Sequence, residues 1–338
     1  MMSMKSDLFI YLTKYNENLK DVTEIDALIF SFLSYLPLDS IVNYDTTIID
    51  AYNNFQKMNL KIKKKDLELF RLIASNKRYN NLVISNVIRL LNYDNAEDFL
   101  ALTINLPNSV FISFRGTTDN IISYRESLEI SYHEIKACND AINYLNNIKS
   151  KKIYVSGHSK GGYLAVKAFL KAKNKIQRRV INVYNFDGPI DYDFNNFKYQ
   201  DKIINILPMD SIVGRLLYDN TIKNVIKSSK KGVMSHDFYN WVIKNNSFVK
   251  TDLSINSDKI KKGFDDILSK VPSENREEFI NQLFKLIMDS GIKKVSEIKI
   301  NNLIKLLVNY KELDKEEKKA FISTIKTIIK SLIMSFNG

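Results

Sequence analysis

The segment GHSKGG, residues 157–162, places a serine between two predicted elements. Apolar residues at 153–155 predict a short buried strand before it, and the pattern over 162–172 predicts a helix after it. In a G-x-S-x-G turn the serine backbone is strained, and its hydroxyl projects from the edge of a sheet. The flanking glycines suit positions where a Cβ would collide with the neighbouring chain. Ser159 is therefore a candidate nucleophile, with a glycine-rich turn and a capping serine as the alternative.

The helix that follows Ser159 directs its free N–H groups and its positive dipole end toward the serine. The N–H of Lys160 is therefore a candidate donor to an oxyanion that forms on a substrate attacked by Ser159.

A serine needs a base to remove its proton, and the chain has three histidines. His158 lies within the turn and is expected to point away from the serine hydroxyl, as a packing residue. His133 precedes the turn on a predicted helix and is expected to be solvated. His236 follows the last predicted strands and fits the chain order of nucleophile, acid and histidine. His236 is therefore the candidate base.

The carboxylate that would orient His236 must lie between Ser159 and His236 in this order. Asp210 follows the strand predicted for KIINIL, and Asp187 follows the strand predicted for VINVYNF. We favour Asp210, because the Asp-Gly-Pro context of Asp187 also suits a simple turn. Four further aspartates are less well placed after strands: Asp191, Asp193, Asp201 and Asp219.

Strands and helices alternate from about residue 97 onward. Strands are predicted over 98–106, 110–114, 153–155, 180–186 and 202–207, and helices over 132–148 and 162–172. This alternation indicates an α/β fold with a mostly parallel central sheet that is covered on both faces.

Both ends of the chain are predicted to be helical. Helices are predicted over 26–35 and 66–91 near the start, and amphipathic helices over 274–290, 295–310 and 314–336 near the end. We therefore predict two domains: residues 1–250 with the sheet and a helical N-terminal part, and residues 251–338 as a helical accessory domain. The accessory domain is expected to cover the active-site edge or to mediate self-association.

Composition limits the classes of function. The net charge is +12, but the lysines are mostly dispersed and their two clusters, at 61–66 and 227–232, are short. No nucleic-acid partner is expected, whereas peripheral contact with an anionic membrane stays open. The sequence carries no zinc-ligand spacing and no phosphate-binding G-x-x-x-x-G-K-[ST] loop, so no metal or cofactor is expected.

The sequence favours a cytoplasmic location. It shows no secretory signal peptide and no apolar run of the roughly 18 residues that span a bilayer. Its single cysteine, Cys138, suits a reducing compartment.

Four sequence blocks, together with the His236 block, resemble the class 3 lipases, and they occur in the family's order: FISFRGT, VSGHSKGG, NFDGP and MDSIVGRL. The likeness is closer to an uncharacterised bacterial branch of the α/β-hydrolases with a GHSKGG elbow, which the segment EIDALIFSFLSYLP also resembles. The likeness spans about residues 95–245. It implies an α/β-hydrolase fold, an oxyanion hole completed by Thr117 beside Lys160, and an acid in the block of Asp210. Class 3 lipases often carry two histidine blocks after the acid, whereas this chain carries one.

These residues predict a serine hydrolase that cleaves a carboxylic ester, with small-molecule and lipid esters as candidate substrates. Ser159 would attack the carbonyl, His236 would transfer protons, and Asp210 would orient His236. One alternative is a catalytically inactive hydrolase-fold scaffold or membrane-surface binding protein. A peptidase or thioesterase with the same residues is another, because the acyl pocket is built from scattered positions.

Overall fold

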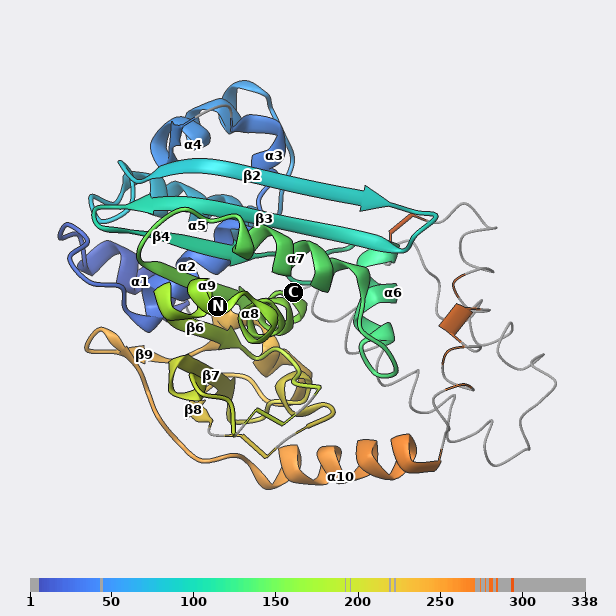
Figure 1. Cartoon of the computed structure of the whole chain (residues 1–338). Coiled ribbons are helices and arrows are strands. Elements are labelled where there is room, and N and C mark those ends of the chain that lie inside the picture. Colours follow the sequence, from blue (N-terminus) through green and yellow to red (C-terminus); the bar gives the residue numbers. More distant parts are fainter. Residues whose placement is uncertain are drawn as a thin grey trace.

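The computed structural model places an eight-stranded sheet at the centre of the molecule, with helices on both faces (Figure 1). It describes residues 6–42, 45–191, 193–194, 196–218, 220–221 and 223–270, with residues 274, 277, 280–281, 284 and 293–294. The strands lie side by side in chain order, from β1 to β8. Their bounds are β1 (Thr46–Thr47), β2 (Val83–Asn92), β3 (Glu97–Leu106), β4 (Ser109–Phe114), β5 (Ile153–His158), β6 (Val180–Phe186), β7 (Ile203–Pro208) and β8 (Asn224–Ile226).

The sheet is antiparallel from β1 to β4 and parallel from β4 to β8. The tight turn at Pro107-Asn108 joins β3 and β4 as a hairpin, as the sequence predicted. Helical crossovers return the chain between β4, β5 and β6, so the carboxyl ends of these strands meet at one edge of the sheet. The predicted α/β class with a mostly parallel sheet is confirmed, and the arrangement is that of an α/β-hydrolase fold.

Two hydrophobic cores lie on the two faces of the sheet, because successive side chains of a strand alternate between its faces. Phe111 of β4 packs into the core beneath the N-terminal helices, and Ile112 packs into the opposite core beneath the later helices. The N-terminal helices are α1 (Asp7–Lys14), α2 (Glu24–Leu33), α3 (Leu38–Ile41), α4 (Ile48–Lys57) and α5 (Lys64–Ser75). The later helices are α6 (Ile121–Glu129), α7 (Lys136–Asn146), α8 (Lys160–Lys171) and α9 (Asn174–Arg179).

The helix predicted over 66–91 is wrong beyond residue 75. Helix α5 ends at Ser75, and the amide of Asn76 donates to the carbonyls of Leu12 and Tyr15, which turns the chain. Residues 83–92 then form β2, which pairs with β3 along its whole length. This hairpin pairing with the next strand overrides the local apolar pattern, which suited either element. The helix predicted over 132–148 also begins later, at Lys136, so His133 lies in the preceding turn and is exposed.

The chain beyond β8 contains short elements and one long helix. The short 3₁₀ helices η3 (Gly232–His236) and η4 (Phe238–Asn240) precede the two-stranded ribbon of β9 (Ile243–Lys244) and β10 (Ser247–Phe248). Helix α10 (Ile255–Lys270) follows, and its Asp258 pairs with Arg215 at 2.6 Å. This contact crosses residue 250, and the two-domain division stays a prediction.

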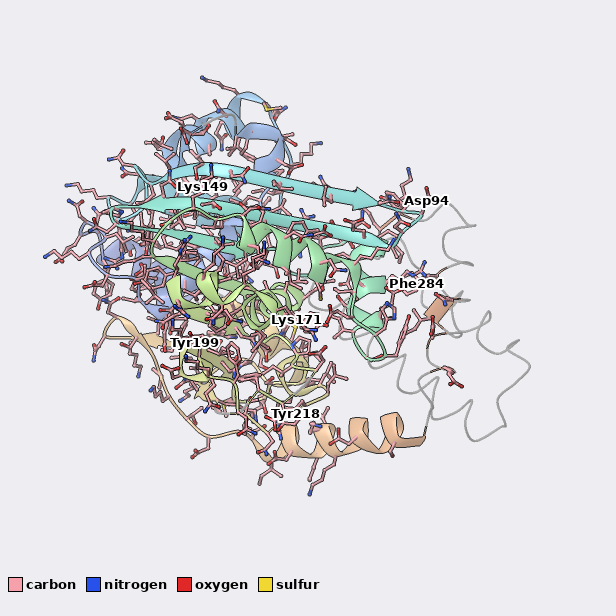
Figure 2. The ribbon with its side chains drawn as sticks, viewed as in Figure 1. Asp94, Lys149, Lys171, Tyr199, Tyr218 and Phe284 are labelled. Carbon is pink, nitrogen blue, oxygen red and sulfur yellow. The ribbon has the colours of Figure 1, made fainter. Side chains whose placement is uncertain are left out.

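Several residues of the C-terminal segment lie against α6. Asn281 accepts a hydrogen bond from Arg125 at 2.8 Å, and the carbonyl of Lys293 accepts from the N–H of Ile121 at 2.9 Å. Phe284 is buried at this end of the molecule (Figure 2). The helix predicted over 274–290 falls mostly outside the described residues, and those predicted over 295–310 and 314–336 fall wholly outside them. In the part of the chain that the structure describes, no helix is long and apolar enough to cross a membrane.

Candidate active site

The turn between β5 and α8 has the strained geometry that the sequence predicted. Ser159 has a φ of 58°, in the left-handed region that a non-glycine residue rarely adopts. A Cβ on Gly157 would lie 2.1 Å from the carbonyl carbon of Gly161, and one on Gly161 would lie 2.2 Å from the carbonyl oxygen of Phe114. The two glycines therefore let β4, β5 and the start of α8 approach closely enough to form this sharp turn.

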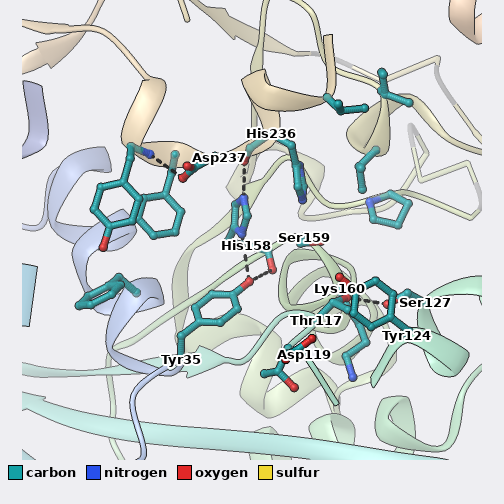
Figure 3. Close-up of a pocket in the computed structure, with 18 of the residues that line it drawn as sticks. Tyr35, Thr117, Asp119, Tyr124, Ser127, His158, Ser159, Lys160, His236 and Asp237 are labelled. Carbon is teal, nitrogen blue, oxygen red and sulfur yellow. Dashed lines mark hydrogen bonds between the residues drawn. The ribbon is translucent and has the colours of Figure 1, made fainter. Parts of the chain in front are cut away.

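His236, at the end of η3, pairs with a buried aspartate. Its Nδ1 lies 2.6 Å from Oδ2 of Asp187. A carboxylate oxygen can only accept, so Nδ1 carries the proton and Nε2 of a neutral ring is left as an acceptor. His236 and Ser159 both line the pocket that Figure 3 shows.

Asp187 is held rigidly where β6 ends. Its φ of 49° is also left-handed, and its N–H donates to the carbonyl of Ile206 on β7. The oxygen that faces away from His236, Oδ1, accepts from the hydroxyl of Ser211 at 2.5 Å and from the N–H of Gly214 at 3.1 Å. Both oxygens therefore have defined partners, and the carboxylate orientation is fixed.

The expectation that Asp210 lies beside His236 is wrong, since Asp187 occupies that place. Asp210 accepts a hydrogen bond from the hydroxyl of Ser254 instead. Asp187 follows β6, the direct neighbour of β5, and the loop after β7 supplies Ser211 and Gly214, which bond to Asp187 rather than to His236.

His158 does more than pack. Its Nε2 lies 2.9 Å from the carbonyl oxygen of His236, so Nε2 is the protonated nitrogen. Its Nδ1 then accepts from the hydroxyl of Tyr35, 3.0 Å away (Figure 3). Burial, with a smaller contribution from His236, lowers the pKa of His158 well below 6.5, so its ring stays neutral. Tyr35 and His158 together anchor the backbone of His236.

Lys160 and Thr117 lie on the other side of Ser159 (Figure 3). Lys160 is the first residue of α8, where the N–H groups of the first turn have no partner within the helix. Thr117 follows β4, and its hydroxyl lies 2.6 Å from the hydroxyl of Ser127 on α6. The structure thus brings together four of the five predicted site residues: Ser159, His236, Thr117 and Lys160.

A buried set of charges lies beneath these two residues. The ammonium of Lys160 pairs with the carboxylate of Glu126, and Arg115 pairs with Asp98 at 2.6 Å. Burial raises the pKa of Glu126 to about 7, although Lys160 opposes the shift. Burial would also raise the pKa of Asp98, but Arg115 and then Lys160 outweigh it, and the pKa is lowered. Lys160 is therefore a structural cation whose side chain points into the protein.

Ser159, His236, Thr117 and Lys160 line one cavity of about 430 Å³, within the usual range for small-molecule sites. Ser159, only 9% exposed, is reached through it. Much of the wall is apolar: Phe32, Leu128, Ile130, Pro189, Ile212, Val213, Leu216, Val233, Phe238 and Ile260. Lys63, Lys65, Asp66 and Asp237 add a charged part, in which Lys65 pairs with Asp237 at 2.8 Å.

Sequence reasoning missed several residues around the site, among them Tyr35, Ser123, Glu126 and Ser211. For Tyr35 the only signal was its partner His158, which lies next to the serine. For Ser123 and Glu126 it was their three-residue spacing on α6. The described residues contain no group of three or more histidines, cysteines or acidic residues that could hold a metal ion.

Comparisons with known proteins place the chain in a family. Two solved structures are similar to it. M37 lipase is 18% identical with a TM-score of 0.37, over 72% of this chain and 80% of that one. A mutant form of MDLA from Penicillium cyclopium is 14% identical with a TM-score of 0.41, over 71% of this chain and 92% of that one. Comparison with curated proteins finds no match. The Mbeg1-like family model matches residues 73–285, more than half of the chain, and the chain therefore belongs to the Mbeg1-like family.

Proposed function

We propose that the protein is a serine hydrolase that cleaves carboxylic esters through an acyl-enzyme. Ser159 is the nucleophile, His236 is the general base and acid, and Asp187 orients His236. The observation that carries the proposal is that the strained Ser159 and His236 line one cavity, while the buried Asp187 pairs with Nδ1 of His236 behind it. A nucleophile, a base and a group that orients the base are the parts that this chemistry requires, and these residues supply one candidate for each.

Acylation begins when Nε2 of His236 accepts the proton of the Ser159 hydroxyl. The serine oxygen then bonds to the ester carbonyl carbon, and the carbonyl oxygen becomes an oxyanion. The proton on Nε2 passes to the alkoxide as the ester C–O bond breaks, so an alcohol leaves and the acyl group stays on Ser159. Asp187 stabilises the imidazolium that exists between these two transfers, and it keeps its own negative charge.

Deacylation repeats the same transfers with water. His236 accepts a proton from water as the hydroxide oxygen attacks the acyl carbon, and it returns the proton to the Ser159 oxygen as the carboxylic acid leaves. The N–H groups of Thr117 and Lys160 are the proposed donors to the oxyanion in both halves of the reaction, each removal of such a donor costing about 10²–10³ in kcat in other enzymes.

The substrate is proposed to carry an apolar acyl chain, because the apolar wall described above surrounds Ser159. Lipid esters belong to this class. Burying each CH₂ group of a chain against such a wall contributes about 0.8 kcal/mol to binding.

Hydrolysis of p-nitrophenyl esters of increasing chain length tests the proposal. Wild-type protein is expected to release p-nitrophenol with kcat/KM rising with acyl length, and Ser159→Ala is expected to lose activity by on the order of 10⁶ in kcat. Wild-type protein that hydrolyses no ester of the series would favour the inactive scaffold instead.

A further inference from the structure

Helix α6 presents three polar side chains toward the site from one of its faces. Ser123, Glu126 and Ser127 are spaced by three and four residues, which places them on the same side of the helix. Ser123 and Glu126 have no exposed surface, and α6 packs against β3 beside the sheet edge that carries the site. The face they form therefore lies inside the protein.

This face of α6 holds the turn at Ser159, between β5 and α8, through Lys160. The Lys160 side chain is 1% exposed, and its Nζ donates to Ser123 Oγ at 3.3 Å and to the carboxylate of Glu126. A third bond, of 2.9 Å, goes to the carbonyl of Asp98 on β3. The residue that directly follows Ser159 is thus tied to α6 by two side chains.

The same face holds the loop after β4. Ser123 Oγ accepts from the N–H of Thr118 at 3.1 Å, and the Ser127 hydroxyl lies 2.6 Å from that of Thr117. Ser123 Oγ is therefore shared between Lys160, one proposed oxyanion donor, and Thr118, the residue that directly follows the other donor, Thr117. Asp98 adds to the connection, since it accepts from Thr118 Oγ1 at 3.3 Å.

We infer that Ser123 and Glu126 are positioning residues that fix the Thr117 and Lys160 N–H donors relative to each other. The inference rests on the proposed function, because it concerns the geometry of the oxyanion hole. Neither residue lines the cavity, so neither is proposed to touch the substrate.

A role in stability alone explains the arrangement poorly. A buried ion pair is weak evidence for stability, since its desolvation cost offsets much of the attraction and apolar residues of similar volume often serve as well. The bonds of Ser123 and Glu126 join the two backbone segments that would carry the donors. A shift of about 1 Å in such a donor can cost about 10²-fold in rate.

Steady-state kinetics on Ser123→Ala and Glu126→Gln test the inference. We expect kcat to fall by about 10- to 100-fold while KM changes by less than about twofold, because the donors act mainly on the transition state. Glu126→Asp, which keeps the charge, is expected to recover part of the loss. Ser123→Ala removes one hydroxyl and no charge, so it stays informative where Glu126→Gln folds poorly.

The matched control is Glu134→Gln. Glu134 pairs at 3.1 Å with Lys167, which lies on α8 as Lys160 does. In the variant, Lys167 retains Asp191 at 2.8 Å as a second partner. We expect Glu134→Gln to leave kcat and KM unchanged. Folded Ser123→Ala and Glu126→Gln proteins that keep wild-type kcat would overturn this inference but not the proposed function. Wild-type protein without esterase activity would refute the proposed function, and with it this inference.

Discussion

Replacing Asp187 by asparagine is expected to abolish most activity by reversing the tautomer of His236. Ser211 and Gly214 both donate to Oδ1 of Asp187, so the amide oxygen of the variant is expected to take that position. Its NH₂ group then faces Nδ1 of His236, which must become the acceptor. The ring proton moves to Nε2, where no proton can be taken from Ser159. The expected loss is about 10⁴ in kcat, or about 5.5 kcal/mol in the activation barrier.

The assay is p-nitrophenyl ester hydrolysis by Asp187→Asn beside Asp210→Asn. Asp210 bonds to Ser254 rather than to His236, so its variant is expected to retain kcat within about tenfold of wild type. Circular dichroism would establish that both variants are folded. A kcat for Asp187→Asn within tenfold of wild type, or a larger loss for Asp210→Asn, would refute this assignment of the acid.

Three further predictions concern the surroundings of the site. His158→Phe keeps an aromatic ring but loses the hydrogen bond to the His236 carbonyl, so we expect kcat to fall about tenfold. The acid limb of the pH–rate profile should stay in place, because burial already keeps His158 neutral. A shifted acid limb would contradict this prediction. Gly157→Ala drives a Cβ into the Gly161 backbone, and we expect it to destabilise the fold by about 1–3 kcal/mol or more, measured as a lower Tm, whereas an unchanged Tm would show that the turn can relax. The pKa of Glu126 is raised from 4.5 to about 7, so between these pH values the folded state binds a proton that the unfolded state releases. The contribution of this carboxyl to the unfolding free energy should therefore fall as pH rises from 4.5 to 7. Glu126→Gln should remove that part of the pH dependence of urea unfolding.

The local elements around Ser159 were predictable from the sequence because strand and helix patterns are local. The strand before the serine extends to His158 and the helix after it begins at Lys160, close to the predicted bounds. The strand over 83–92 was not predictable, because its consecutive apolar residues suit either element and only pairing with β3 decides between them.

The partner of His236 illustrates what local patterns leave open. Asp187 and Asp210 both follow strands, and nothing in either segment states that β6 is the neighbour of β5. The Tyr35–His158 pair and the polar face of α6 join segments 123 and 34 to 37 residues apart, and such contacts depend on the assembled sheet. The proposed nucleophile and base were therefore easier to predict than the residues that hold them in place.

Mapping the residue that reacts with a fluorophosphonate probe tests the central claim most directly. The probe forms a covalent phosphonyl bond with an activated serine, and the modified peptide is identified by mass spectrometry after proteolysis. We predict a single adduct on Ser159, and no adduct on Ser159→Ala or after denaturation, because activation requires the folded His236–Asp187 pair. Folded wild-type protein that is unmodified, or modified at another serine, would contradict the account.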